Sequence, residues 1–488
     1  MNPLLDAFEK VCAERGGALA AGDQAVAFNY QTLRAVAAGL AEQIEARTQQ
    51  SQVGILAPTS AVGAAAIFAC WYAGKVPVPL NFLLSPAEMG RIIRDAELDF
   101  ILTVPHFQAA AAATGLNHLV LTPESLTPAQ ATRPVDRSRR DARADDVAAI
   151  LYTSGTSGDP KGVCLSYENL TRNALACIEH AHIRPDHVWL SPLPQFHTFG
   201  FTVLTVTPLL LGSTVWYLPR FSPAALAQIV AEKKVSVLIA IPSMFAAVLN
   251  LKSAQREMFQ TLEYTISGGE PLPEKVYRGF LERFGVAICE GYGLTETAPV
   301  VSMNMPWDNR PGSVGRPIPG VSVTVVDEDG AELPAGQTGE LVVRGHGVML
   351  GYYHNPEATA EVLRDGALWT GDMGYLDADG FVHITGRAKE MIIVGGENVF
   401  PREIENVLAE HSAVREAAVI GVRDDVRGEL PAAFVILKED AVANETELRD
   451  FCRSRLAGYK VPRWVRIAPE LPRSATGKIL KRALIPPP

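Results

Sequence analysis

The sequence predicts an α/β fold with a large N-terminal portion, an antiparallel β insert and a smaller C-terminal α+β domain. Amphipathic helices and short buried strands alternate along the first part of the chain. Leu33, Val36 and Leu40 repeat with the 3.6-residue period of a helix. The runs 53–57 and 235–241 are short and contain β-branched residues, which favours strands buried on both faces. This alternation is typical of a sheet covered by helices.

The second half of the chain carries two further changes of pattern. Between about residues 321 and 351, the strand-like stretches VSVTVV and GELVVRG are separated by the turn residues Asp327–Gly330. We therefore expect an antiparallel β insert. After Gly386, a strand-like MIIV and a Gly-Gly pair precede Pro401, which suits the first turn of a helix with Ile404 on its apolar face. The remainder of the chain is expected to form a small α+β domain.

Composition and charge exclude several classes of protein. With 488 residues, 48% of them hydrophobic and 20% charged, the chain is long enough for more than one domain with its own core. The formal net charge of −10 argues against a broad basic surface for nucleic acid, so an anionic ligand must be held by local groups. The six cysteines are widely separated without a C-x-x-C pair, which predicts reduced thiols, a cytoplasmic location and no structural zinc site.

Neither an export signal nor a membrane span is expected. The first residues include acidic side chains and lack an apolar core of signal-peptide type. The most apolar stretch, residues 62–80, is interrupted by glycine, lysine and proline and falls short of the roughly 20 apolar residues that a membrane-spanning helix needs. We interpret this stretch as a buried helix that runs into a strand. Peripheral association with a membrane stays open.

A loop rich in hydroxyls and glycines follows the strand expected to end at Tyr152. Residues 153–162 read TSGTSGDPKG. Glycines allow backbone N–H groups to turn toward an anion, hydroxyls add neutral donors, and Lys161 adds a positive charge. The loop is not a Walker A motif, because no Gly-Lys in the chain is followed by Ser or Thr. A flexible surface turn would explain the glycines but not the whole composition, so we predict a phosphate-binding loop.

Residues 152–162 resemble the signature loop of the adenylate-forming superfamily, which includes acyl-CoA synthetases, peptide-synthetase adenylation domains and beetle luciferases. The other family segments follow in the expected order: Phe196–Gly200, Ser267–Pro271, Gly291–Glu296, Trp369–Asp372, Gly386–Glu390 and Arg473–Lys478. The resemblance thus spans nearly the whole chain. In motif it is closest to fatty acyl-CoA synthetases and bacterial acyl-carrier-protein synthetases.

The resemblance implies a two-step ligase that uses ATP, Mg²⁺ and a thiol, with coenzyme A as the first choice of co-substrate. An organic acid attacks the α-phosphorus of ATP to give acyl-AMP and pyrophosphate, and the thiol then displaces AMP. Both steps concentrate negative charge. At about 4 Å and an effective dielectric of about 20, one unit charge contributes on the order of 4 kcal/mol before desolvation, so Mg²⁺ and lysine should dominate.

The resemblance also assigns roles to individual residues around ATP. Glu296 would bind Mg²⁺, and Thr295 would contact the α-phosphate. Tyr292 would stack on adenine, and Asp372 would accept hydrogen bonds from the ribose hydroxyls. The full ATP-binding set is Thr153, Ser154, Gly155, Thr156, Ser157, Gly158, Lys161, Gly268, Gly269, Glu270, Tyr292, Gly293, Asp372 and Arg387. Outside such motifs, a lone Glu, Asp or Arg is more often in a surface ion pair.

Catalysis and domain motion are assigned by resemblance to the C-terminal part. Lys478 matches the family lysine that bridges the acyl carboxylate and phosphate, although a lysine near a terminus is usually just solvated. The expected domains are residues 1–387, for AMP and acyl binding, and residues 388–488, a mobile catalytic domain with its hinge near Lys389. Rotation of this domain would bring Gly395–Gly396 to the site as part of a tunnel for the thiol.

The identity of the acid depends on the segment around His197. Amino-acid-activating relatives usually carry an Asp at this position, so an α-amino acid is disfavoured. Phe196, Phe199 and Phe201 belong to an almost wholly apolar segment and would line a slot for a hydrocarbon chain, although most of that segment is expected to be core. His197 would gate or orient the acyl carboxylate rather than act as a general base.

A fatty acyl-CoA synthetase is the first expectation for the function. An aromatic-acid CoA ligase is second, and a ligase for a short dicarboxylate is third, because no extra Arg stands out as a second carboxylate clamp. A ligase that loads a separate acyl carrier protein, a light-emitting or oxidative relative, and a catalytically silent nucleotide sensor also stay open. The sequence does not determine the chain length of the acid, the pathway or the oligomeric state.

Overall fold

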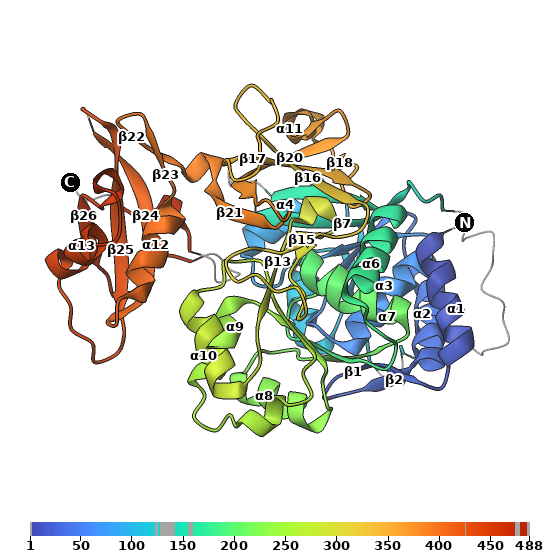
Figure 1. Cartoon of the computed structure of the whole chain (residues 1–488). Helices are drawn as coiled ribbons and strands as arrows, with labels where there is room; N and C mark the ends of the chain where they lie inside the picture. The colour runs from blue at the N-terminus through green and yellow to red at the C-terminus, as the bar shows by residue number, and fades with distance from the viewer. Residues whose placement is uncertain are drawn as a thin grey trace. The chain divides into compact units, whose positions relative to one another are not determined.

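The structure is a computed structural model that describes residues 2–122, 125–126, 142–154, 160–424, 426–473 and 479–485. The described residues belong to two compact units. The first unit comprises residues 1–272, 276–323 and 343–368, and the second comprises residues 273–275, 324–342 and 369–488. Both units combine helices and strands (Figure 1), which confirms the α/β fold class. The domain boundary between residues 387 and 388 stays a prediction.

A mainly parallel sheet lies at the centre of the first unit, with the strand order β15-β14-β13-β12-β11-β9-β10-β1-β2. Neighbouring strands from β13 to β1 are parallel, whereas β2, β14 and β15 pair antiparallel. The predicted run 235–241 is confirmed as β11, whose residues are all buried. The strands are Leu19–Gly22 (β1), Ala27–Asn29 (β2), Val188–Ser191 (β9), Thr214–Tyr217 (β10), Val237–Ala240 (β11), Tyr264–Ser267 (β12), Cys289–Gly293 (β13), Val300–Met303 (β14) and Arg316–Pro317 (β15).

A separate parallel sheet has the order β4-β3-β5-β6. Its strands are Gln52–Leu56 (β3), Val76–Pro79 (β4), Phe100–Thr103 (β5) and Asn117–Val120 (β6). The prediction of a strand at 53–57 is therefore confirmed. The apolar stretch 62–80 forms the buried helix α3 (Ala61–Tyr72) followed by β4, also as predicted. In the part of the chain that the structure describes, no helix is long and apolar enough to cross a membrane.

Helices cover these sheets. The helix predicted around Leu33, Val36 and Leu40 is α2, and all three side chains are buried. Helix α1 packs against α2, α6 and α7, and α2 packs against α3 (Figure 1). The remaining helices before residue 363 are Pro3–Arg15 (α1), Tyr30–Glu45 (α2), Pro86–Asp95 (α4), Gln108–Ala113 (α5), Tyr167–Ala181 (α6), Thr207–Leu211 (α7), Pro223–Glu232 (α8), Pro242–Asn250 (α9), Glu274–Phe284 (α10) and Pro356–Val362 (α11).

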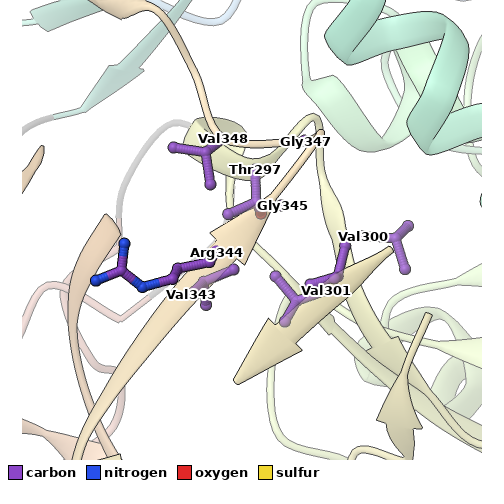
Figure 2. Close-up of a pocket in the computed structure, with 9 residues that line it drawn as sticks. Thr297, Val300, Val301, Val343, Arg344, Gly345, Gly347 and Val348 are labelled. Atoms are coloured by element: carbon purple, nitrogen blue, oxygen red, sulfur yellow. The ribbon is translucent and has the colours of Figure 1, made fainter. Parts of the chain in front are cut away.

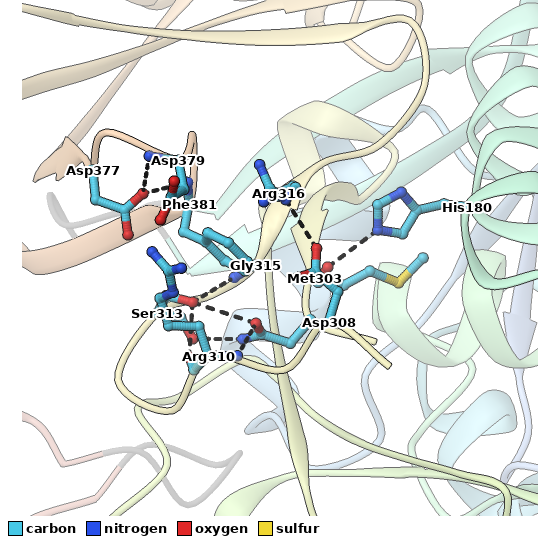
Figure 3. A network of polar contacts seen from close by, with 11 residues as sticks. His180, Met303, Asp308, Arg310, Ser313, Gly315, Arg316, Asp377, Asp379 and Phe381 are labelled. Atoms are coloured by element: carbon cyan, nitrogen blue, oxygen red, sulfur yellow. Dashed lines mark hydrogen bonds and ion pairs between the residues drawn. The ribbon is translucent and has the colours of Figure 1, made fainter. Parts of the chain in front are cut away.

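The β insert is present as a sheet with the order β16-β17-β20-β19, in which β21 also pairs with β20. Its strands are Val321–Val326 (β16), Gly339–Gly345 (β17), Leu363–Arg364 (β19), Ala367–Leu376 (β20) and Val382–Arg387 (β21). The predicted turn after β16 is closed by Asp327, whose carboxylate accepts hydrogen bonds from the N–H groups of Asp329 (3.0 Å) and Ala331 (2.8 Å). Asp377 closes the turn between β20 and β21 in the same way, with Phe381 as one donor (3.0 Å; Figure 3).

The C-terminal segment forms the expected α+β arrangement. A sheet with the order β23-β22-β25-β24, and β26 beside β25, packs against α12 and α13. Pro401 begins α12, and Ile404 and Leu408 are buried on its apolar face. The elements are Ile392–Val394 (β22), Glu397–Val399 (β23), Pro401–Glu410 (α12), Val414–Asp424 (β24), Gly428–Leu437 (β25), Glu445–Arg453 (α13) and Trp464–Ile467 (β26).

A buried asparagine organises the loop between β14 and β15. Asn304 donates hydrogen bonds to the carbonyl oxygens of Glu290 (3.3 Å) and Ser313 (2.8 Å), and it accepts one from the N–H of Arg310 (3.0 Å). The hydroxyl of Ser313 in turn accepts a hydrogen bond from the N–H of Gly315 (3.2 Å; Figure 3). Because Glu290 belongs to β13, these bonds tie the loop to the strand that leads into the GYGLTE segment.

Two glycines of this loop give a matched test of its packing. Gly315 has a φ of +83°, and a Cβ there would overlap the backbone of Met303 and Asn304. Gly312 has a φ of +86°, but no described atom lies within 4 Å of its Cβ position. Gly312→Ala should lower the free energy of unfolding by about 1 kcal/mol, the usual cost of a left-handed non-glycine residue. Gly315→Ala should lower it by about 3 kcal/mol or more, because the backbone must also move. Equal losses in urea denaturation would contradict this packing.

Candidate active site

The GYGLTE segment forms a strand followed by a tight turn. Tyr292 is buried in β13, and a Cβ at Gly293 would overlap the carbonyl group of Pro299. The hydroxyl of Thr297 accepts a hydrogen bond from the N–H of Leu294 (3.0 Å) and donates one to the carbonyl oxygen of Pro299 (2.5 Å). The backbone between β13 and β14 therefore has little freedom, and the turn that carries Thr295 and Glu296 is fixed from both sides.

The carboxylate of Glu296 is held by a tyrosine that the sequence analysis did not select. The hydroxyl of Tyr352 donates a hydrogen bond to Glu296 Oε1 (2.8 Å). The ring of the same tyrosine lies under Lys161, whose Nζ is 4.9 Å from the ring centroid. The structure thus brings two of the predicted ATP-site residues, Lys161 and Glu296, together on opposite parts of one side chain.

The signature loop joins two paired strands. β7 (Val147–Ser154) and β8 (Pro160–Ser166) are antiparallel, with Thr153 opposite Lys161 and Ser154 opposite Pro160. The two ends of the loop are therefore held side by side. The predicted phosphate contacts Gly155, Thr156, Ser157 and Gly158 lie outside the described residues.

The predicted adenine segment follows β12 at the carboxyl end of that strand. Gly268 comes directly after β12, and Gly269 has a φ of +80°, which only glycine adopts readily. β12 pairs in parallel with β13, so Gly268 and Gly269, which follow β12, and Tyr292, near the end of β13, lie at the carboxyl edge of the sheet. Ligands of open α/β sheets bind at such an edge. A Cβ at Gly268 would lie 3.1 Å from the ring of Phe199, so a larger residue would push that ring away.

The segment after His197 is a π-helix, Phe199–Val206. The hydroxyl groups of Thr205 and Thr207 donate hydrogen bonds to carbonyl oxygens five residues earlier, at 2.9 and 3.0 Å. Such wide helical turns are rare and occur frequently at functional sites. Of the predicted acyl-pocket residues, Phe196 and Phe199 lie near the start of this element. Phe201 is completely buried and packs edge-on against Trp71, with ring centroids 5.9 Å apart, so it is a core residue.

In the second unit, Asp372 and Arg387 form an ion pair. The two residues are directly opposite each other in β20 and β21, and Arg387 Nε lies 2.6 Å from Asp372 Oδ1. The aspartate side chain is 6% exposed and the arginine side chain 48% exposed. The N–H of Asp372 also donates a hydrogen bond to the hydroxyl of Thr370 (3.0 Å), which fixes the strand at this point.

The other C-terminal predictions fall only in part on described residues. Lys389 lies in the short turn Ala388–Glu390 between β21 and β22. Gly395 and Gly396 connect β22 to β23 with φ values of +61° and +91°, and no described atom other than those of the glycine itself and its chain neighbours lies within 4 Å of either Cβ position. These glycines are therefore in open surroundings. Lys478 lies outside the described residues.

A narrow packing gap lies beside Thr297, next to the turn that carries Glu296 (Figure 2). It has no room for a water molecule, so it is not a binding site for the acid. Its lining comes mainly from valines of β14, β16, β17 and the loop after β17: Thr297, Val300, Val301, Val321, Val343, Arg344, Gly345, Gly347 and Val348. The turn that carries Glu296 therefore rests on a closely packed apolar base.

The comparisons with known proteins agree with this geometry. The family model for AMP-binding enzymes matches residues 8–353, and the model for the AMP-binding enzyme C-terminal domain matches residues 403–478. The chain belongs to the AMP-binding enzyme family. It is therefore a member of the adenylate-forming superfamily, as the motifs indicated, and its CoA ligase relatives identify it as an acid–thiol ligase with ATP and CoA as substrates.

The relatives differ in the acids that their names specify. A long-chain-fatty-acid–CoA ligase from Bacillus subtilis is 41% identical over 344 residues, which cover 70% of this chain but only 61% of that protein. A feruloyl-CoA synthase from Amycolatopsis is 36% identical over 432 residues. The match covers 88% of this chain and 87% of that protein. ATP-bound MatB from Rhodopseudomonas palustris is 34% identical, with a TM-score of 0.89 over 98% of this chain and 97% of that one. These matches confirm the fold and leave the acid open.

The described residues around Glu296 suit a Mg²⁺ ion that takes most of its ligands from the nucleotide phosphates and water. In the described segments, no group of three or more His, Cys, Asp or Glu side chains lies together as a metal site. A single fixed carboxylate, Glu296, is nevertheless what Mg²⁺ needs when substrate phosphates and water supply its other ligands. Glu296 would therefore hold the ion that neutralises the phosphates.

The Glu296 assignment gives a direct test. Glu296→Gln should raise the Mg²⁺ concentration for half-maximal pyrophosphate release by about tenfold or more, because a neutral amide binds a hard cation weakly. Glu357→Gln, at an exposed position of α11, should leave the Mg²⁺ titration unchanged. Superimposable titrations for the two variants would exclude Glu296 as a metal ligand.

Proposed function

We propose that this ligase activates a fatty acid, converting it through acyl-AMP to a fatty acyl-CoA. The observation that carries this proposal is the apolar segment that follows His197. Phe196 is 5% exposed, and residues 198–206 contain no Asp, Glu, Lys or Arg, so that threonine hydroxyls are their only polar side-chain groups. An apolar segment next to His197, which could contact the carboxylate of the acid, suits a substrate with a hydrocarbon chain. Similarity to long-chain-fatty-acid–CoA ligases supports the same class.

An aromatic acid is the second candidate. The ring of Phe199 lies against Gly268, so a flat ring system already occupies part of this region. The feruloyl-CoA synthase match extends along more of the chain than the first fatty-acid match does. An anthranilate CoA ligase with 28% identity and a TM-score of 0.89 adds to this alternative. A short dicarboxylate stays the third candidate.

The proposed roles follow from the charge that the reaction develops. Lys161 would contact the phosphates, Glu296 would hold Mg²⁺, and Asp372 would accept hydrogen bonds from the ribose. His197 would orient the acid carboxylate toward the α-phosphorus. Bound Mg²⁺ would supply positive charge at the phosphates. Lys478 would then neutralise the carboxylate and phosphate oxygens as they approach each other.

The hinge and the thiol tunnel are part of the same proposal. We infer that residues 388–488 rotate about Lys389 between the two half-reactions and that Gly395–Gly396 then faces the thiol. Two glycines with positive φ and open surroundings leave backbone accessible for a narrow ligand. CoA is the acceptor that the relatives favour over a separate acyl carrier protein.

A pyrophosphate-release screen tests the substrate. Saturated fatty acids of graded length, hydroxycinnamates and benzoates, and short dicarboxylates are each supplied with ATP and Mg²⁺, with and without CoA. We expect CoA-stimulated release that peaks at one fatty-acid length. If the rate of pyrophosphate release is instead highest with an aromatic acid or a dicarboxylate, that class is the substrate and the fatty-acid proposal is wrong. Acid-dependent release without CoA stimulation would instead indicate a carrier protein as acceptor.

Lys478 can be tested by separating the half-reactions. Lys478→Ala should reduce acyl-AMP formation by about 100-fold or more, because one charge next to the transferring group is lost, while thioester formation from supplied acyl-AMP changes little. Arg463→Ala, which removes an exposed charge from the same unit, should change neither rate. Equal losses in both half-reactions of Lys478→Ala would refute the assigned role.

A further inference from the structure

The strand β18 (Gly351–Tyr352) contacts both parts of the proposed phosphate site. It pairs antiparallel with β8, directly after the signature loop. The N–H of Tyr353 donates a hydrogen bond to the carbonyl oxygen of Gly162 (2.7 Å). On its other side, the N–H of Met349 donates to the carbonyl oxygen of Glu296 (2.9 Å). One short segment of backbone thus joins the strand that bears Lys161 to the turn that bears Glu296.

The side chain of Tyr352 repeats this connection with the charged groups. Its hydroxyl donates to the Glu296 carboxylate at 2.8 Å, and its ring faces the ammonium of Lys161 at 4.9 Å. The backbone N–H of Tyr352 donates to the hydroxyl of Thr359 (2.9 Å), which is itself bonded to the carbonyl oxygen of Asn355 (2.8 Å). The backbone of Tyr352 is therefore anchored to α11, and its side chain is oriented by Glu296 and Lys161.

A phenol suits this position for a physical reason. It offers the carboxylate a neutral hydrogen-bond donor and the ammonium the negative face of an aromatic ring. Each charge is thus oriented by an uncharged partner. A cationic donor in the same place would neutralise the carboxylate, and an anion would neutralise the lysine. With tyrosine, the formal charges of Lys161 and Glu296 are retained for phosphate and metal.

We propose that Tyr352 is a positioning residue that fixes Glu296 and Lys161 relative to each other before Mg²⁺ and ATP bind. The proposal rests on the assigned roles of these two residues and adds a third group that touches neither metal nor phosphate. Its neighbour Tyr353 serves as a matched control, because its hydroxyl accepts a hydrogen bond from the amide of Gln52 (2.8 Å). Both tyrosines are partly buried.

The test compares Tyr352→Phe with Tyr353→Phe in the full-length protein. The first readout is the Mg²⁺ concentration for half-maximal pyrophosphate release. The second is the dissociation constant of ATP, measured by calorimetry with Mg²⁺ and with EDTA. We expect Tyr352→Phe to raise the half-activating Mg²⁺ concentration by about tenfold, because a hydrogen bond to a charged group is lost, and to leave ATP binding in EDTA within about twofold. Tyr353→Phe should leave both values unchanged.

A second substitution separates the ring from the hydroxyl. Tyr352→Leu also removes the aromatic face under Lys161, so it should weaken ATP binding in EDTA by about threefold as well. Thermal denaturation of all variants reports any general loss of stability. A loss of stability shared by the variants, with unchanged Mg²⁺ and ATP constants, would reduce Tyr352 to a structural residue and overturn the proposal.

Glu296→Gln distinguishes failure of this proposal from failure of the site assignment. If Glu296→Gln shifts the Mg²⁺ titration and Tyr352→Phe does not, the positioning role of Tyr352 is wrong and the metal role of Glu296 stands. If neither variant shifts it, both assignments fail. If both shift it, the double variant should shift it no further than Glu296→Gln alone, because the hydroxyl acts through that carboxylate.

Discussion

Binding a triphosphate to a chain with a net charge of −10 depends on where a few charges are held. The overall field of the protein does not attract the ligand, and salt screens exposed charges beyond about 10 Å. Affinity must therefore come from groups in direct contact. The hairpin of β7 and β8, the turn after β13 and the strand β18 between them all serve this need, because together they fix one ammonium and one carboxylate around a neutral phenol.

Helices and strands whose formation depends on the residues within them could be predicted from the sequence. The period of α2 and the apolar run of β11 identify buried elements without knowledge of their partners. The signature loop was found because its chemistry depends on neighbouring residues, and GYGLTE was found through the resemblance to the family. Tyr352 was missed because its contact with Glu296 spans 56 residues, and a pair of adjacent tyrosines gives no indication of which one faces a carboxylate.

The acyl segment shows a different limit of prediction. A run such as FGFTVLTV predicts an apolar helix, but it does not show whether each N–H bonds to the carbonyl oxygen four residues earlier, as in an α-helix, or five residues earlier, as in a π-helix. The wider turn also decides which faces the aromatic residues take. Phe201 packs against Trp71, whereas Phe199 reaches Gly268. The acyl segment and the predicted adenine segment therefore touch where the ring of Phe199 packs against Gly268. This contact requires a glycine at position 268, because a Cβ there would crowd the ring.

The ion pair between Arg387 and Asp372 in the second unit is another case in which a neighbouring group orients a carboxylate. A carboxylate that is 6% exposed is costly to keep charged unless a partner and hydrogen bonds compensate for lost hydration. Arg387 supplies that charge from a half-exposed position, and its place opposite Asp372 in an antiparallel pair is set by the backbone rather than by side-chain flexibility. Each of the two proposed carboxylate contacts thus has its orientation set before ligand arrives: Glu296 by a neutral phenol, Asp372 by a guanidinium. The first arrangement retains a full negative charge for a cation, whereas the second leaves a neutralised pair suited to hydroxyl groups, which matches the different ligands proposed for the two carboxylates.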